Sequence, residues 1–582
     1  MMKKILAILA LAVFMALVPG IGGQAVYSAE NIDNSVYVEA PLYFNGSKTS
    51  DSAWRVKGNV YITVDMLKRY GSASGLNIDS SALRIYFDPA DLDLDIGDSE
   101  TTAFIQKYAG ECYIPLKSFK DDVYVSLNVV SQLAHLDYYI ESGRLYLSDG
   151  SGEAPNEDSF KDAGSIKSGG ARAAGSLTEG TAGDTKLSAG TAVKKIGETA
   201  SFYKVETRDG DVFYINKRDY SEQAGQGAAD SKDPSEGSDF VFRAKQKKSG
   251  SSEKINMAWV HVSQETGVTS LIPDTPNPGC EILSPTWLHQ NVNDNGTVQN
   301  LCDRGFVDLA HENGYEIWMS VTNKFSSKGS TNYTSEVLAD TKLRRKTIAQ
   351  YLFYTCLYDG DGINIDYETV KDGDRKNYTT FMTELSGYCD RLGLTLSCAL
   401  PPYYSWYEEF DYAALGKLCD YITVMSYTER TTNDKTAGPI ASRSFLTKTV
   451  EDLLKYMSAD RILLGDPMYC VVWKCDSAGR VVSASTYTMK RVREFVDTWD
   501  EEPVWDEVSG QYLIEHAADD GYTQKIWLES ERSKAMRLSL VEDYGLAGTC
   551  CWQYLQAESD TWNIYEDVYK NGVDPHSIET PY

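Results

Sequence analysis

From about residue 254 to residue 571, short apolar runs alternate with amphipathic stretches. This pattern is typical of repeated strand–helix units. Amphipathic stretches such as 307–313, 342–357 and 378–392 predict helices between most of the runs. Eight units in about 320 residues predict a (β/α)8 TIM barrel over residues 253–572, with its active site at the C-terminal ends of the strands. The predicted strands are Ile255 to Val260, Glu281 to Ser284, Glu316 to Val321, Gly362 to Tyr367, Thr395 to Ala399, Tyr421 to Met425, Arg461 to Gly465 and Gly545 to Trp552.

The stretch between Tyr469 and Gly545 is longer than one helix requires. Connections of this length inside a compact domain usually carry structure of their own. We therefore expect an inserted subdomain here that forms one wall of the cleft.

Residues 34–149 form a separate unit with a weak internal repeat. The run Val60 to Leu67 is echoed by Val123 to Val130, and each run precedes a short helical pattern and a further strand, 83–87 and 144–147. This duplication predicts a small α+β domain. It resembles the domain named for the N-terminus of copper amine oxidases, without copper ligands, and the resemblance implies a wall-facing or spacer module.

Residues 170–220 lie between two segments rich in Gly, Ser and charged residues, 150–169 and 221–252, which are predicted linkers. Between the linkers, alternating runs flank Asp209-Gly210, a hairpin signal. The order resembles the bacterial SH3-like module of wall hydrolases, a small β-barrel. An unrelated hairpin module is the alternative.

The chain begins with Met1-Met2-Lys3-Lys4, followed by an apolar run from Ile5 to Val18 and a Pro-Gly breaker. This is the pattern of a secretory signal peptide, predicted over residues 1–29, and the run is too short to span a bilayer comfortably. An uncleaved anchor is the alternative. We expect a secreted protein, extracellular or wall-associated, that has no membrane contact after cleavage.

The net charge and the cysteine and histidine pattern exclude some classes of function. The chain has 56 Lys and Arg against 84 Asp and Glu, a net charge of −28, which excludes a general nucleic-acid binder. The 11 cysteines are not a dense disulfide framework, although Cys470 and Cys475 are near enough in sequence to pair. No Cys or His spacing matches a zinc site, so we predict neither a metal nor another cofactor.

The fourth predicted strand carries polar residues at every second position. Side chains two apart on a strand share a face, so Asn364, Asp366 and Glu368 are predicted to point into the barrel. An inward polar row is costly unless it is hydrogen-bonded. Because the row ends in a carboxylate at the strand's C-terminal end, we interpret it as catalytic rather than as a structural polar cluster.

This strand, from Asp361 to Glu368, resembles the DxxDxDxE signature of glycoside hydrolase family 18, the chitinase-like barrels, with Asn364 in place of an Asp. Met425-Ser426-Tyr427 resembles the family's Met-x-Tyr, and Trp552 resembles the tryptophan that floors the sugar site. The segments 283–287 (LSPTW) and 438–442 (GPIAS) resemble the wall-acting and spore-associated branch, as does Asn364.

The resemblance implies a substrate-assisted retaining mechanism. Glu368 is then the general acid and base, Asp366 holds the acetamido N–H, and Tyr427 orients the acetamido oxygen. Asn364 is expected to orient Asp366 by hydrogen bonding. The further residues predicted to bind substrate are Trp552, Met425, Trp259, Trp287, Trp318 and Tyr403.

The predicted function is hydrolysis of β-1,4 bonds next to N-acetylglucosamine in peptidoglycan by a secreted, monomeric enzyme. Two alternatives remain open on the sequence. One is a chitinase or another N-acetylglucosaminidase, and the other is a glycan-binding barrel without catalysis. The presence of Glu368 disfavours the second alternative, since non-catalytic members usually lose the acid.

Overall fold

The computed structural model describes residues 37–582, leaving out 57–58, 73–74, 120–121, 142, 152–163, 167–170, 175–184, 188–191, 199–201, 208–211, 218–219, 222–239, 243, 246–252, 263–275, 291–295, 324–332, 369 and 519. The predicted signal peptide lies outside the described residues. Among the helices that are described, none has the length and apolar character needed to cross a bilayer.

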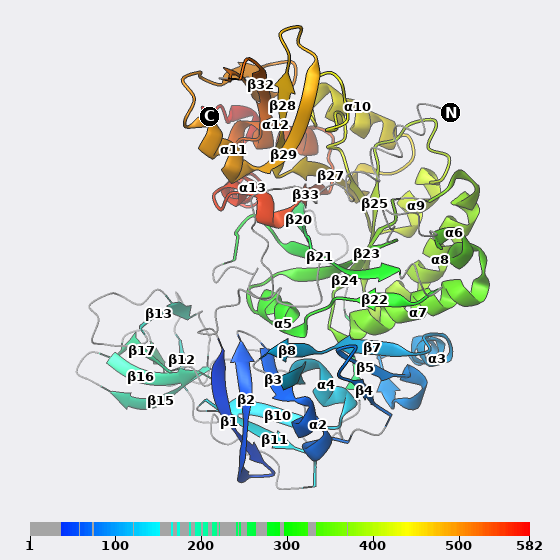
Figure 1. The fold of residues 1–582 in the computed structure, drawn as a ribbon, viewed down its shortest axis with the longest axis vertical. Helices are drawn as coiled ribbons and strands as arrows, with labels where there is room; N and C mark the ends of the chain where they lie inside the picture. The colour runs from blue at the N-terminus through cyan, green and yellow to red at the C-terminus, as the bar shows by residue number, and fades with distance from the viewer. Residues whose placement is uncertain are drawn as a thin grey trace.

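A closed parallel barrel occupies the middle of the molecule (Figure 1). All eight predicted strands are confirmed, and the first strand pairs with both the second and the eighth, which closes the sheet. The strands are β20 (Ile255–Val260), β21 (Ile282–Gln290), β23 (Glu316–Thr322), β24 (Gly362–Asp366), β25 (Thr395–Leu400), β26 (Tyr421–Val424), β27 (Ile462–Pro467) and β33 (Gly548–Trp552).

Helices cover the outside of the barrel, as a parallel sheet buried on both faces requires. The short strand β22 (Val298–Asn300) pairs antiparallel with the end of β21. The helices are α5 (Arg304–Glu312), α6 (Thr334–Ala339), α7 (Thr341–Leu357), α8 (Arg375–Leu392), α9 (Tyr412–Leu418), α10 (Arg443–Leu453), α12 (Glu531–Asp543) and α13 (Thr561–Tyr569).

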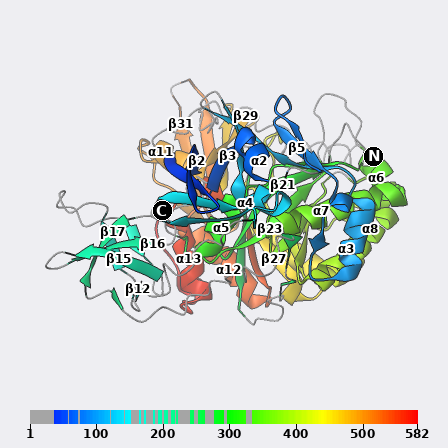
Figure 2. The same ribbon diagram turned by 90° about the horizontal axis from the view of Figure 1, so that it is seen from below.

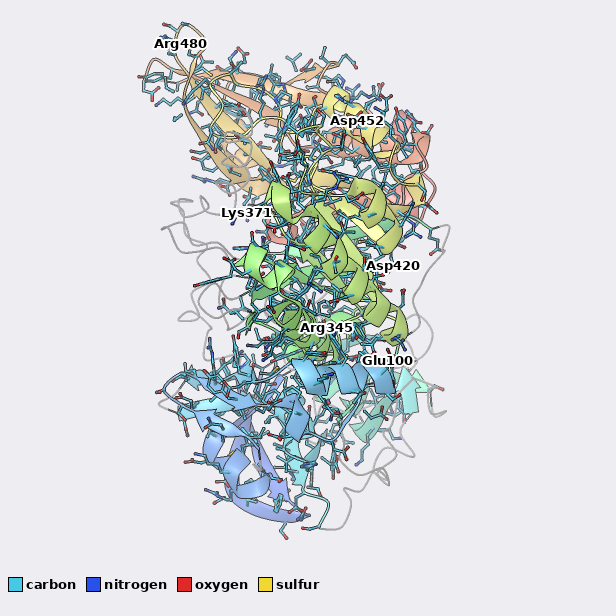
Figure 3. The ribbon with its side chains drawn as sticks, turned by 90° about the vertical axis from the view of Figure 1, so that its right-hand side faces the viewer. Glu100, Arg345, Lys371, Asp420, Asp452 and Arg480 are labelled. Carbon is cyan, nitrogen blue, oxygen red and sulfur yellow. The ribbon has the colours of Figure 1, made fainter. Side chains whose placement is uncertain are left out.

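An inserted subdomain follows β27, as predicted. Its five-stranded antiparallel sheet has the order β29-β28-β32-β31-β30, and its tip, near Arg480, lies far from the barrel (Figure 3). The chain then returns through α12 to the last barrel strand. The elements are β28 (Tyr469–Cys475), β29 (Val481–Thr488), α11 (Met489–Val496), β30 (Val504–Asp506), β31 (Gln511–Ala517) and β32 (Thr523–Leu528).

The N-terminal unit contains the repeat that the sequence predicts. In each half, a strand leads directly into a helix: β3 (Asn59–Thr63) into α2 (Val64–Tyr70), and β9 (Asp122–Ser126) into α4 (Leu127–Leu133). A seven-stranded and a three-stranded sheet result. The remaining elements are β1 (Val38–Phe44), β2 (Ser47–Val56), β4 (Asn77–Asp79), β5 (Arg84–Phe87), β6 (Leu94–Asp95), α3 (Ser99–Tyr108), β7 (Cys112–Pro115), β8 (Lys117–Phe119), β10 (Asp137–Glu141) and β11 (Arg144–Ser148).

The N-terminal unit packs against the barrel through a buried, hydrogen-bonded interface. Asn300 of β22 donates its main-chain N–H to the Tyr113 hydroxyl and its side-chain amide to the Tyr113 carbonyl, at 2.8 and 3.0 Å. Gln350 on α7 donates to the Ala109 carbonyl at 2.7 Å. Glu100 on α3 and Arg345 on α7 mark the two sides of the boundary in Figure 3. Since these contacts are buried and paired, the two units form one folded body.

A third sheet is described in parts between residues 164 and 221, around a small core of Leu187, Val193, Val205 and Ile215. Its strands are β12 (Gly164–Ile166), β13 (Ala171–Ala174), β14 (Thr185–Leu187), β15 (Ala192–Glu198), β16 (Phe202–Thr207), β17 (Val212–Asn216) and β18 (Tyr220–Ser221). Figures 1 and 2 both draw it at the side of the molecule. The predicted second linker contains β19 (Phe240–Val241), which pairs with β6, and the buried Phe242. The described end of this segment is therefore held on the protein surface.

Candidate active site

The polar row lies where the alternation of the fourth strand places it. Thr322, the last residue of β23, is in register with Asp366, the last residue of β24, so both stand at the C-terminal mouth of the barrel. Asn364 and Asp366 are buried, and Glu368 follows two residues beyond the strand. Tyr367 points the other way and bonds through its hydroxyl to Tyr351 of α7 at 2.7 Å. The period-two prediction is therefore confirmed for this strand.

The two carboxyl groups of the row are desolvated and close to each other. Asp366 Oδ1 and Glu368 Oε2 are both buried without a hydrogen-bond partner among the described residues. Burial raises the pKa of Asp366 to about 7. Burial, and after it the charge of Asp366, raise the pKa of Glu368 well above its ordinary value. Two neighbouring carboxyls of this kind share a proton at neutral pH, which makes one of them an acid.

Asn364 does not make the contact that was expected of it. Its side-chain oxygen accepts from Trp259 Nε1 at 3.0 Å, and its amide donates to Ser397 Oγ at 2.8 Å and to Thr423 Oγ1 at 3.3 Å. Within the part of the chain that is described, none of its hydrogen bonds goes to Asp366, so that expectation is wrong. Side chains that point into the barrel from β20, β25 and β26 bond to Asn364, so its amide group is already paired without Asp366.

Tyr427 and Trp552 lie beside the row. Burial raises the pKa of Tyr427, and the nearby Asp366 and Glu368 carboxyls add to that increase. Trp552 ends β33 with its ring half-buried, 6.0 Å from the ring of Trp259. Trp259 is 1% exposed, so it supports Trp552 and Asn364 from below. Met425, also buried, follows β26 and donates its main-chain N–H to the Leu400 carbonyl.

Three predicted substrate-binding residues lie elsewhere. The ring of Trp287 packs edge-on against Phe306 of α5, in the helical layer. Trp318 is in register with Gly362, the first residue of β24, and stacks on Tyr421, the first residue of β26. It therefore stands at the N-terminal end of the barrel, opposite the mouth.

Tyr403, the third of these residues, directs its ring at Tyr412 of α9 and at Tyr456 beyond α10, with centroids 5.2 and 4.7 Å away. Both partners belong to the outer helical layer. Tyr403 is half-buried, and the ring contacts that the structure shows for it are packing contacts. Its role in binding substrate stays a prediction.

Asp361, the first residue of the motif, has a structural role. It stands at the N-terminal end of β24, bonded to Lys245 Nζ and His311 Nε2, each at 2.7 Å. Burial alone would raise its pKa, but His311 and Lys245 outweigh burial and lower it to about 2. Asp361 thus fastens the segment that precedes the barrel to the barrel floor.

Asn323 and Tyr407 were not predicted. Asn323 directly follows β23 and accepts the main-chain N–H of Glu368 at 3.1 Å. Tyr407, after β25, has its pKa raised by burial and further by nearby groups that include Glu368. Both residues follow a strand at its C-terminal end, the position at which barrel enzymes place functional residues. That rule, applied to every strand, would have found them.

Within the described part of the chain, no group of three or more His, Cys, Asp or Glu side chains is arranged to hold a metal ion. All eleven cysteines are buried free thiols, including Cys470 and Cys475, so these two do not pair.

Comparison with known proteins shows the family of the barrel. Residues 227–557, more than half of the chain, match the family described as glycosyl hydrolases family 18. The cortical fragment-lytic enzyme of Bacillus subtilis is 22% identical over 263 residues, which are 44% of this chain and 60% of that protein. The chain thus spans about 60% of the length of this curated relative.

Two solved structures have a similar fold. One is the spore cortex-lytic enzyme SleL of Bacillus cereus, at 19% identity and a TM-score of 0.49, over 57% of this chain and 76% of that one. The other is a chitinase from Chromobacterium violaceum, at 20% identity and a TM-score of 0.47, over 56% of this chain and 100% of that one.

Proposed function

The chain belongs to glycosyl hydrolases family 18, and on that basis we propose that this glycoside hydrolase cleaves β-1,4 bonds next to N-acetylglucosamine in peptidoglycan. The observation that carries the proposal is the buried pair of Asp366 and Glu368, which has no cationic partner among the described residues. A carboxyl group kept protonated at neutral pH is what a general acid needs.

The reaction in this proposal is substrate-assisted. Glu368 gives its proton to the glycosidic oxygen while the acetamido oxygen of the same sugar attacks the anomeric carbon, so the glycosidic bond breaks as a C–O bond of an oxazolinium ring forms. Glu368, now ionised, takes a proton from water, and the resulting hydroxide opens the ring. Two inversions at one carbon give net retention.

Asp366 and Tyr427 serve the acetamido group in this proposal. Asp366 accepts the acetamido N–H through Oδ1, which has no protein partner among the described residues. The Tyr427 hydroxyl donates to the acetamido oxygen and holds it below the anomeric carbon. Trp552 supplies the apolar floor for the sugar ring. Asn364, which is fully paired, supports this floor through Trp259.

Two observations favour peptidoglycan over chitin. Curated relatives of this chain are named cortical fragment-lytic enzymes. The sequence between residues 170 and 220 also resembles a module of wall hydrolases. In this proposal the protein is exported through its N-terminal signal peptide and acts on wall or cortex glycan, with the N-terminal units holding it near the substrate.

The first test compares Glu368→Gln with the wild type on purified cortex or wall glycan and on colloidal chitin, with products identified by mass spectrometry. We expect the wild type to release fragments with N-acetylglucosamine at the reducing end, and Glu368→Gln to be slower by about 10³-fold, the scale of a lost general acid. Glu408→Gln, the same change at an exposed position on the loop after β25, is the matched control and should retain full activity.

Three outcomes would count against the proposal. Wild-type turnover by Glu368→Gln would remove the general acid from the mechanism. Faster release from chitin than from wall glycan would favour a chitinase. Binding of glycan with no turnover by the wild type would favour a glycan-binding protein.

A further inference from the structure

The main chain of Glu368 is held by a side chain from the neighbouring strand. β24 ends at Asp366, so the main-chain N–H of Glu368 lies beyond the sheet ladder. β23 likewise ends at Thr322, one residue before Asn323. The Asn323 side-chain oxygen accepts the Glu368 N–H at 3.1 Å and so supplies the acceptor that the ladder no longer provides.

Asn323 is itself fixed. It is 1% exposed, and its amide group donates to Thr334 Oγ1 at 3.1 Å. Thr334 is the first residue of α6 and is also buried. A buried amide with both ends bonded has little freedom to rotate, because turning it would leave a donor and an acceptor unpaired. Asn323 therefore connects β23, α6 and the end of the catalytic strand rigidly.

We propose that Asn323 is a positioning residue for the general acid. It holds the Glu368 main chain so that the carboxyl group stands beside Asp366 and faces the glycosidic oxygen. The inference rests on the proposed function, in which Glu368 gives and takes the proton. A displacement of about 1 Å in a catalytic group lowers the rate by up to about 10²-fold.

An amide suits this position better than a charged group. A second carboxylate here would add a third negative charge to Asp366 and Glu368 and would raise their pKa values further. A cation would lower both pKa values and would deprotonate the acid. A neutral amide fixes the main chain and leaves the shared proton in place.

The test begins with Asn323→Ala in the full chain. We expect kcat to fall by about 10- to 100-fold, while KM stays within about threefold, because the sugar contacts of Trp552 and Tyr427 are unchanged. Melting temperature and secondary structure are measured on the same samples to confirm folding.

Asn323→Asp provides the readout that a purely structural role would not change. When protonated, Asp is close in shape to Asn and can accept from Glu368 and donate to Thr334. When ionised, it repels the pair. We therefore expect partial rescue of kcat at low pH and a progressive loss as pH rises, shifted from the wild-type profile. The other titratable groups facing Glu368 are Asp366 on β24, Tyr427 after β26 and Tyr407 after β25, and all three are the same in both proteins.

Asn300→Ala is the matched control. Asn300 is a fully buried asparagine that makes hydrogen bonds to Tyr113, Tyr358 and Cys302, in the interface with the N-terminal unit. Its loss should lower the melting temperature and leave kcat of the folded protein unchanged.

The outcomes separate the two proposals. If Asn323→Ala keeps wild-type kcat, or if Asn300→Ala loses kcat to the same extent, Asn323 has only a structural role and the inference is overturned. If Asn323→Asp follows the wild-type pH profile, positioning through the neutral amide is also overturned. If the wild type releases no fragments at all, the proposed function fails, and the inference fails with it.

Discussion

The molecule contains two buried pairs of acidic residues, and each pair has one member at the C-terminal end of a barrel strand. The two pairs differ in whether cations lie beside them. Asp366 ends the fourth strand, Glu368 lies two residues beyond it, and neither has a cation beside it among the described residues. Asp466, on the seventh strand, and Glu529, at the end of the inserted subdomain, share Lys534 and Arg537 of α12. The closest contacts are 2.6 Å, from Lys534 to Asp466 and from Arg537 to Glu529. All four side chains of this second cluster are fully buried.

The difference appears in the pKa values. Burial raises the pKa of Glu368, and the neighbouring Asp366 charge adds to the shift. Burial would also raise the pKa of Glu529, but Arg537 and Lys534 outweigh it, so the pKa of Glu529 is lowered. Burial alone therefore does not identify a catalytic carboxyl. What distinguishes the proposed catalytic pair is burial without a compensating cation, an arrangement that costs free energy and is typical of functional sites.

The second cluster, Asp466, Glu529, Lys534 and Arg537, is named the compensated cluster because its cations balance its carboxylates. It also holds two parts of the fold together. Asp466 belongs to the barrel, Glu529 to the subdomain and the two cations to the helix that leads back. Gln511 of β31 adds a hydrogen bond to Glu529 at 2.9 Å. The cluster thus fastens the inserted subdomain to the barrel at a fixed angle.

The largest stability effect is expected from Glu529→Gln. The substitution leaves two buried cations with one carboxylate, and an uncompensated buried charge costs about 3–5 kcal/mol of unfolding free energy. Urea or guanidinium denaturation measures the loss, and Glu507→Gln, exposed on the β30–β31 hairpin, is the control. The kcat of the folded protein should stay within a few-fold of wild type. A wild-type denaturation midpoint would show that the cluster contributes no net stability.

Asp366→Asn should instead stabilise the protein, and the gain should depend on pH. The folded-state pKa of Asp366 is about 7, against an ordinary value of 3.8. Between these values the folded state binds more protons than the unfolded state, so stability falls as pH rises from about 4 to 7. Removing the carboxyl removes this loss. We expect a gain on the order of 4 kcal/mol at pH 8 and almost none at pH 4, together with loss of turnover.

The measurement is the melting temperature of Asp366→Asn and wild type from pH 4 to 8. Asp497→Asn, on the exposed end of α11, serves as the control and should give no pH-dependent gain. A gain of equal size at every pH would mean that the Asp366 carboxyl is not desolvated in the folded state. The two pairs therefore predict changes of opposite sign in the free energy of unfolding: Glu529→Gln lowers it and Asp366→Asn raises it.

Local patterns in the sequence predicted the barrel and its catalytic row because both depend on short-range periodicity. The eight strands are apolar runs, and Asp366 and Glu368 lie two residues apart on one face of a strand. The prediction for Trp287 failed because the pairing of β21 with β23 shifts register between Thr286 and Leu288, which interrupts simple alternation. Trp318 is the third residue of β23 and therefore lies near the N-terminal end of the strand, away from the mouth of the barrel.

Other features depend on contacts between distant segments, which periodicity does not encode. The hydrogen bonds of Asn364 come from three other strands. Lys534 and Arg537 lie on a helix in which charged residues ordinarily suggest a solvated face. Only the tertiary fold brings Asp466 and Glu529 to them. Asn323 lies between these two cases. The sequence predicts its position directly after a strand, but it does not predict the hydrogen bond to Glu368.

The smallest expected effect on stability concerns one hydrogen bond of the compensated cluster. It tests whether a bond to a charged carboxylate contributes more than a bond to a neutral carbonyl. Tyr565 of α13 donates its hydroxyl to Asp466 Oδ2 at 2.6 Å, whereas Tyr412 donates to the neutral Pro401 carbonyl at 3.0 Å. A hydrogen bond to a charged group contributes about 1.5–3 kcal/mol, and one between neutral groups about 0.5–1.5. We therefore expect Tyr565→Phe to cost about 1 kcal/mol more than Tyr412→Phe in denaturant unfolding. Equal costs would mean that Lys534 and Arg537 already neutralise Asp466 so fully that its carboxylate accepts like an ordinary carbonyl.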